Sequence, residues 1–246
     1  MIISKRDLII ALAATSIISG LLYWSAEPGS EVVVKKEMND DQPIVNWQKI
    51  VITEEEEDIF INMTIPRVII FSDYGLGVKL SQTIIAYVES LKDEFVFSVS
   101  TAAEDTGETN TLNIETEILL ITPRLISLAF TATERMAGIE QDNDLERTFL
   151  VFDLAKGKTM VEDNKLFRDD SAWADAVKIM KTSLLAGYQG EPNCDLLFAP
   201  KHSGFAASCI GVDRSRGARH LSITGNIPIS LIQEFLAPAV LSDIVK

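Results

Sequence analysis

An unbroken apolar run near the N-terminus, Leu8 to Ala26, is the strongest hydrophobic pattern in the chain. A helix of about 19 residues rises roughly 28 Å, close to the thickness of the bilayer hydrocarbon core, and the run carries no charge. Lys5 and Arg6 precede it, and basic residues favour retention of the short N-terminal end in the cytoplasm. We expect a cytoplasmic tail over residues 1–7, a transmembrane signal anchor over 8–26 and an extracytoplasmic remainder.

Two other interpretations of this run stay open. A cleaved signal peptide would end at the small residue Ala26, but Trp24 would then stand where cleavage sites carry a small side chain. An apolar run can also form a buried core helix.

Polar residues separate the apolar run from the part of the chain that is patterned for folding. Residues 27–46 are rich in charge, contain Pro and Gly and have no sustained period, which predicts a linker. Residues 47–246 suit one domain, or two small subdomains divided near residue 140. The predicted fold class is α+β, with antiparallel sheets and packed helices after one N-terminal transmembrane helix.

Alternation of apolar and polar residues predicts most of the strands in the first part of this domain. An acidic run, Glu54 to Asp58, reads as a solvated turn, and the apolar spacing over Leu76–Leu91 predicts an amphipathic helix. Pro66 should end the second strand or place it at a sheet edge. The expected strands are Lys49–Thr53, Ile59–Ile65, Phe95–Val99, Leu112–Thr122, Arg124–Glu134 and Arg147–Leu154.

Helical and hairpin patterns follow in the C-terminal part. We expect a helix over Asp170–Tyr188 with Asp169, Asp170 or Ser171 as its cap, and a terminal helix from Ser230 to Ile244 that is interrupted at Pro238. Between them lie a hairpin over Cys194–Ile210 and a strand over Arg219–Thr224. The hairpin at Gly157 should bring together a structural core of Phe152, Leu166, Phe167 and Trp173.

The cysteine pair predicts a disulfide. Cys194 and Cys209 are placed symmetrically about a turn at Pro200–Ser203, so they should face each other across the hairpin. A bridge would close a loop of about 15 residues. Two reduced, packed cysteines are the alternative, because a cross-strand bridge has demanding geometry.

Charge narrows the range of partners. The chain has 246 residues, 47 % of them hydrophobic, and a net charge of −14. Such a surface disfavours nucleic acid, anionic lipid and anionic wall polymers. It suits a cationic partner, although acidity also serves solubility alone. The sequence specifies no oligomeric state.

No catalytic, cofactor or metal constellation is evident in the sequence. Asp105-Thr106-Gly107 is a single, wet copy of a motif that aspartic proteases need twice, and Asp142, Asn143 and Asp144 are only a fragment of a calcium loop. His202 and His220 have no serine elbow or free cysteine with which to form a triad. We therefore expect no catalytic residues, no cofactor and no metal.

One block of the sequence supports a family resemblance. The stretch Phe149 to Leu185, with Phe152-Asp153-Leu154 before a Gly-Lys hairpin and Leu166-Phe167 before a helix, resembles the extracytoplasmic module of lysozyme-sensing anti-sigma factors. The same module precedes the catalytic domain of some membrane-anchored peptidoglycan deacetylases. Only seven residues precede the apolar run, and neither the Asp-Asp nor the paired-histidine motif of a deacetylase is present. The resemblance therefore concerns the accessory module alone, over about residues 48–240.

Three functions are compatible with these observations. The first is a membrane-anchored, non-catalytic binding or sensing module of the bacterial cell envelope, whose partner the resemblance implies to be a cell-wall component or a cationic wall-acting protein. The second is a structural or assembly subunit of a membrane complex. The third is an unrecognised envelope hydrolase.

Overall fold

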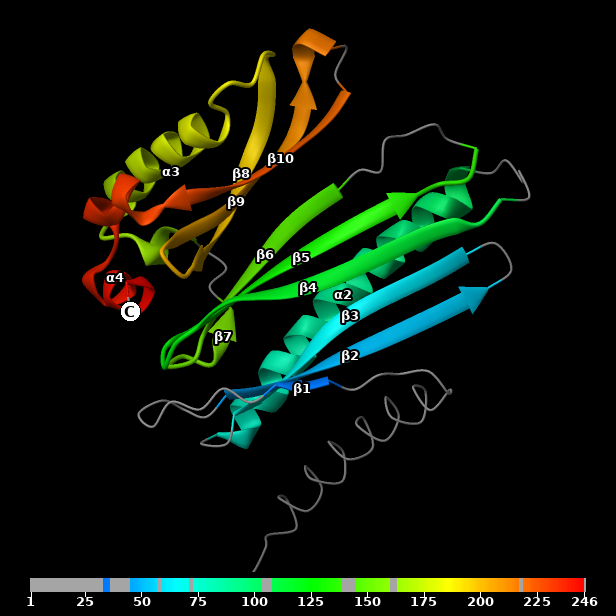
Figure 1. Ribbon diagram of the computed structural model, residues 1–246, viewed down its shortest axis with the longest axis horizontal. Coiled ribbons are helices and arrows are strands. Elements are labelled where there is room, and N and C mark those ends of the chain that lie inside the picture. Colours follow the sequence, from blue (N-terminus) through cyan, green and yellow to red (C-terminus); the bar gives the residue numbers. More distant parts are fainter. Residues whose placement is uncertain are drawn as a thin grey trace, which may run out of the picture.

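The computed structural model describes residues 33–35, 45–56, 59–70, 73–102, 108–138, 145–159, 163–216 and 219–245. These residues form two β-sheets with helices packed on them, an α+β fold (Figure 1). The apolar run 8–26, Asp105–Gly107 and Asp142–Asp144 lie outside the described residues. Among the helices that the structure does describe, none is long and apolar enough to cross a membrane.

The larger sheet contains seven strands, which lie side by side in chain order. All neighbouring pairs are antiparallel except β3 and β4, which are parallel. The expectation of purely antiparallel sheets is wrong at this pair because a long helix, α2 (Tyr74–Ala102), returns the chain to the same end of the sheet. The strands are β1 (Val33–Lys35), β2 (Val45–Glu56), β3 (Ile59–Ile70), β4 (Asn110–Ile121), β5 (Leu125–Arg135), β6 (Leu145–Asp153) and β7 (Lys158–Thr159).

Strand β3 runs through Pro66, so the expectation that this residue ends the strand is wrong, whereas the alternative, a position at a sheet edge, is confirmed among the described strands. Pairing with β4 stops at Met63, whereas pairing with β2 continues to Ile70. The backbone N–H of Val68 donates to the Ser81 hydroxyl of α2 instead of to β2. Pro66 is two residues away on the same side of the strand, so its missing N–H costs no bond to β2.

Helix α2 is longer than predicted and includes the segment Phe95–Val99 that was expected to be a strand. Its start is capped, because the Leu76 backbone N–H donates to the Asp73 carboxylate at 3.0 Å. Phe95 is fully buried, but Phe97 is 68 % exposed. The prediction was wrong because an alternating pattern of three residues also fits the end of a helical stripe, on which Val88 and Phe95 share one face.

A smaller sheet and several helices form the C-terminal unit. This sheet is antiparallel, in the order β10 (Arg219–Pro228), β9 (Gly204–Asp213) and β8 (Pro192–Lys201). The accompanying helices are η1 (Asp163–Leu166), α3 (Asp170–Leu184), η2 (Arg214–Arg216), η3 (Ile229–Leu231), η4 (Gln233–Phe235) and α4 (Pro238–Ile244).

The helices of this unit follow the predicted signals with shifted limits. Asp169 caps α3 by accepting a hydrogen bond from the Ala172 N–H at 2.8 Å, one of the three predicted caps. The helix ends at Leu184, four residues before the predicted Tyr188. The predicted interruption of the terminal helix at Pro238 is confirmed, since α4 begins at this residue, but the part before it forms two 3₁₀ turns instead of an α-helix.

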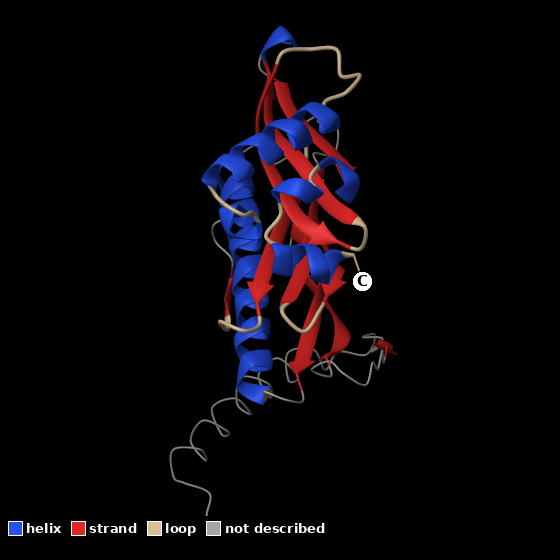
Figure 2. Cartoon of the chain, turned by 90° about the vertical axis from the view of Figure 1, so that its left-hand side faces the viewer, coloured by secondary structure: helices blue, strands red, loops and turns tan. Residues whose placement is uncertain are grey.

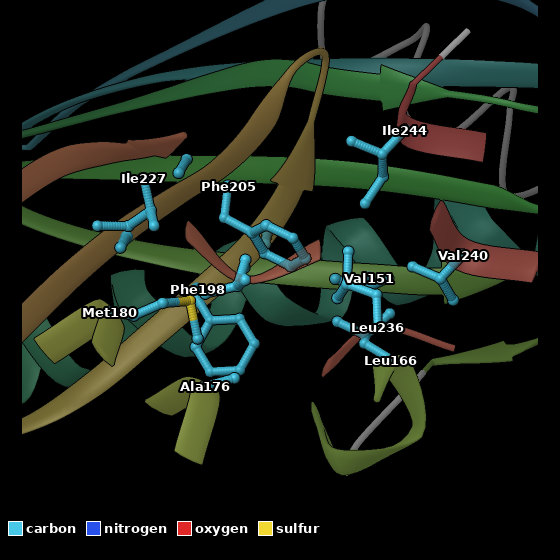
Figure 3. Close-up of a cluster of buried hydrophobic side chains, with 14 of the residues drawn as sticks. Val151, Leu166, Ala176, Met180, Phe198, Phe205, Ile227, Leu236, Val240 and Ile244 are labelled. Carbon is cyan, nitrogen blue, oxygen red and sulfur yellow. The ribbon is translucent and has the colours of Figure 1, made fainter. Parts of the chain in front are cut away.

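Two hydrophobic cores lie on opposite faces of the larger sheet. Helix α2 packs on one face (Figure 2), where its buried Leu80 belongs to the same core as Phe130 and Phe152 of the sheet. The second core lies between the other face and the C-terminal unit (Figure 3), and it includes Phe198 and Phe205.

The predicted core of four residues is therefore only partly correct. Phe152, Leu166 and Phe167 are buried, but Phe152 belongs to the core under α2, while Leu166 and Phe167 belong to the second core. Trp173 is 37 % exposed. The buried stripe of α3 is Ala172, Ala176 and Met180, so Trp173 lies one residue off that stripe.

Candidate binding surface on the larger sheet

The two faces of the larger sheet differ in what covers them. Along β4 and β5, alternate residues point to α2, and the residues between them point to the opposite side. On the α2 side, Ile114, Leu128 and Phe130 are fully buried. The Tyr87 hydroxyl of α2 also lies there and bonds the Thr148 hydroxyl at 2.5 Å, and burial raises the pKa of Tyr87.

The C-terminal unit covers only one half of the opposite face. Strand β8 contacts β4, β5 and β6. The residues beneath it include Leu125, Ala129 and Val151, and a register irregularity between Ile118 and Leu120 brings Leu119 into the same core. In this half the strands carry apolar residues on both faces, so the C-terminal unit packs on the side that α2 does not cover.

The remaining half of that face is accessible to solvent and mostly polar, with Phe60 as an exposed apolar residue, and we call it the open face. Strand pairing aligns its residues across β2 to β6. In Figure 1 this side of the sheet is toward the viewer, and α2 lies behind it. Each of its residues is exposed or partly exposed: Glu55, Phe60, Asn62, Asn113, Glu115, Glu117, Thr131, Thr133 and Arg147.

Side chains on the open face are partly ordered by one another. The Asn62 amide donates to the Asn113 side-chain oxygen of the adjacent strand at 2.9 Å. At the border with the C-terminal unit, Arg147 pairs with Glu117 at 2.6 Å and its guanidinium lies 5.9 Å from the centre of the Phe149 ring. These contacts connect amide, carboxylate and guanidinium groups of β3, β4 and β6 across the open face.

The chemistry available on this surface is hydrogen bonding and ion pairing. Within the described residues there is no group of three or more His, Cys, Asp or Glu side chains that could hold a metal ion. His220 Nε2 lies 3.4 Å from the Glu146 carboxylate, and His202 is an exposed residue of a hairpin turn.

Cys194 and Cys209 form the predicted disulfide, with a Cα–Cα distance of 5.4 Å. Their predicted pairing is wrong by two residues, since Cys194 pairs with Gly211 and Cys209 with Leu196. The turn consists of His202 and Ser203 instead of Pro200–Ser203, which shifts the register. The cysteines are therefore diagonal neighbours, still on the same face of the hairpin.

A buried carboxylate, that of Asp213, fixes the end of this hairpin near the disulfide. It accepts hydrogen bonds from the Tyr188 hydroxyl at 2.6 Å, the Ser215 hydroxyl at 2.7 Å and the backbone N–H groups of Ser215 and Glu191. These donors, Tyr188 first, lower the pKa of Asp213 to about 2. A Cβ at Gly190 would lie 2.6 Å from the same carboxylate, so a larger residue here would displace it.

The open face was not predicted, although the sequence carries a signal for it. Asn113, Glu115 and Glu117 in β4, and Thr131 and Thr133 in β5, are polar at every second residue. Strands of this kind have one solvated face. What the pattern alone could not give is that β2, β3 and β6 continue the same polar face.

Comparison with known proteins identifies the fold. No family model and no curated protein matches the sequence. A crystal structure of a DUF3298 family member from Bacteroides fragilis is similar, with a TM-score of 0.51 and 12 % identity, over 88 % of this chain and 97 % of that one. A DUF3298 family protein from Pseudomonas aeruginosa gives a TM-score of 0.45 and 10 % identity, over 88 % and 98 %. The chain thus has a fold like that of the Bacteroides protein.

Proposed function

We propose that the chain is a membrane-anchored, non-catalytic binding or sensing module on the outer side of a bacterial cell membrane. Its partner is a cell-wall component or a cationic protein that acts on the wall, and the open face is the binding surface. The anchor is the apolar run 8–26, which tethers the folded part to the membrane.

The open face is the observation that carries this proposal. Folded domains cover the apolar faces of their sheets, and this sheet is covered by α2 on one side and by the C-terminal unit on half of the other. The remaining half presents ordered polar groups, which suit a hydrogen-bonding ligand better than they suit a further packed layer.

The fold likeness supports the resemblance noted in the sequence. The similar Bacteroides structure is a DUF3298 family member, and this domain is found in lysozyme-sensing anti-sigma factors and in the accessory regions of deacetylases. Because the identity is 12 %, a shared partner is part of our proposal and not a consequence of the fold.

The disulfide supports the proposed location. Disulfides persist outside the cytosol, where thiols are not kept reduced. The bond between Cys194 and Cys209 also leaves the chain without a free thiol nucleophile. With His220 beside Glu146 and His202 in an exposed turn, binding accounts for the described residues more simply than catalysis does.

The test is direct binding by the full chain reconstituted in nanodiscs. Two probes are used: insoluble peptidoglycan in a sedimentation assay, and lysozyme on a biosensor surface. We expect one of them to bind, and we expect Thr131→Tyr, which places a large side chain at the centre of the open face, to weaken binding at least about tenfold.

The matched control is Thr182→Tyr, the same substitution at an exposed position of α3. It should leave the affinity unchanged. If neither probe binds, or if the two variants weaken binding equally, the open face is not the site and the proposal is wrong.

A further inference from the structure

The second strand forms an edge of the larger sheet that is only partly paired. β1 pairs with Trp47, Gln48 and Lys49 of β2. In the described part of the chain, Val51–Glu56 has a strand neighbour on one side only, β3.

The direction of the free backbone groups can be derived from β3. The N–H and C=O of Val68 both bond the Ser81 hydroxyl and so point away from β2. Val68 is opposite Trp47, and the register between the strands is regular. In an antiparallel pair such positions recur at every second residue. The backbone groups of Val51, Thr53 and Glu55 therefore point outward from the free edge.

This edge is able to accept a strand. It lacks proline and a bulge, the usual devices that block pairing, and Val51, Ile52 and Thr53 are β-branched. The short strand β1, which directly precedes β2 in the chain, already pairs antiparallel with the other end of β2. The outer side of β2 is thus already paired with a strand next to its free part.

Acidic side chains protect this edge against unwanted strand pairing, and they also favour a basic partner. Glu54, on the α2 side, is neutralised by Lys92 at 2.6 Å. Burial alone would lower the pKa of Lys92, but the hydrogen bond and charge of Glu54 raise it above its usual value. Glu55 is exposed on the other side, within the open face. A second acidic edge of the same chain would be repelled, whereas basic side chains would pair with Glu55.

We propose that an extended polypeptide segment with lysine or arginine at alternate positions adds as a strand to the free edge of β2. Its backbone pairs with Val51, Thr53 and Glu55, and its basic side chains lie beside Glu55 on the open face. This inference rests on the proposed function and makes its partner a cationic protein segment instead of a wall polymer.

The probe is a synthetic peptide of about ten residues that alternates lysine and valine, added to the full chain in nanodiscs. Two control peptides are an N-methylated version, which keeps the charge but cannot donate along one edge, and a glutamate version. We expect only the unmodified cationic peptide to bind, and to slow hydrogen exchange of the outward amides of Val51, Thr53 and Glu55 at least about tenfold.

Two substitutions at the edge and one control elsewhere locate the site. Thr53→Pro removes an outward N–H without removing a bond to β3, and Glu55→Lys reverses the charge; each should weaken peptide binding at least about tenfold. Glu234→Lys makes the same charge change at an exposed position in η4 and should leave the affinity unchanged. Circular dichroism of each variant checks the fold. If Glu55→Lys does not fold, Glu55→Gln takes its place and should weaken peptide binding by a smaller factor.

Equal binding of the N-methylated peptide, equal loss in Glu234→Lys or unchanged exchange of the outward amides would overturn the proposal. If the chain self-associates and this protects the same amides without peptide, a second copy of the chain occupies the free edge. The proposal would then also be wrong. The proposed function would still stand after any of these results if peptidoglycan or lysozyme binds and Thr131→Tyr weakens that binding.

Discussion

The two faces of the larger sheet are built from adjacent residues of the same strands, but one is buried under α2 and the other is partly open to solvent. Phe130 points to α2 and is fully buried, whereas Thr131, the next residue of β5, lies on the open face. The same contrast holds for Ile114 and Glu115 in β4. At these positions the apolar burial is therefore on the α2 side alone, which leaves the open face free to bind.

The largest effect is expected from alanine substitutions at these two adjacent positions, which test the contrast between the faces. Phe130→Ala should lower the free energy of unfolding by about 3–5 kcal/mol, because it leaves a cavity under α2. Thr131→Ala should lower it by less than about 1 kcal/mol. Urea denaturation of both variants gives the comparison, and equal losses would contradict the assignment of the faces.

The covered half of the second face depends on the C-terminal unit keeping its shape. Replacing Cys194 and Cys209 together by alanine should lower the free energy of unfolding by about 3 kcal/mol, since the bridge closes a loop of about 15 residues. Adding a reductant to the unmodified chain before unfolding should give a similar loss. Because the disulfide lies away from the open face, ligand affinity of the folded variant should not change; a lower affinity would show that the two halves are coupled.

Much of the larger sheet could be predicted, because its signals are local. β4 and β5 have the strand limits and the alternation that the sequence indicates, and the Asp169 cap was among the expected residues. The disulfide was also predictable, since it needs only that the two cysteines fall near each other on one hairpin.

The errors arose where a tertiary contact decides between two local patterns. Phe95–Val99 alternates like a strand but continues α2, because the sheet provides a partner for Phe95 at that end of the helix. Trp173 is among the most hydrophobic residues of α3, yet the small residues Ala172 and Ala176 form the buried stripe, which lets α3 approach closely. The free edge of β2 also depends on strand order, which alternation does not contain.

The Asp213 network gives a test of the C-terminal unit that leaves the open face untouched. The pKa of this carboxyl is about 2 in the folded chain, below its ordinary value of 3.8. Its contribution to stability is therefore complete above about pH 4 and is lost as the pH falls toward 2. Asp213→Asn should unfold more easily at pH 6 and should lose this part of the acid dependence. Thermal melts of both proteins between pH 6 and 2 measure it, and parallel curves would show that the carboxylate is not the cause.

The smallest expected effect compares two ion pairs of equal length on opposite faces. Lys92–Glu54 on the α2 side and Arg147–Glu117 on the open face both have a 2.6 Å contact, but the side chain of Glu54 is 20 % exposed and that of Glu117 is 64 % exposed. Glu117→Gln should therefore cost only about 0.2–1 kcal/mol, and high salt should abolish the difference. Glu54→Gln should cost more and should keep its effect in salt, because water and ions reach that pair less easily. Urea denaturation of both variants at low and high salt separates the outcomes, and an equal salt response would mean that the α2 side is as accessible to solvent as the open face.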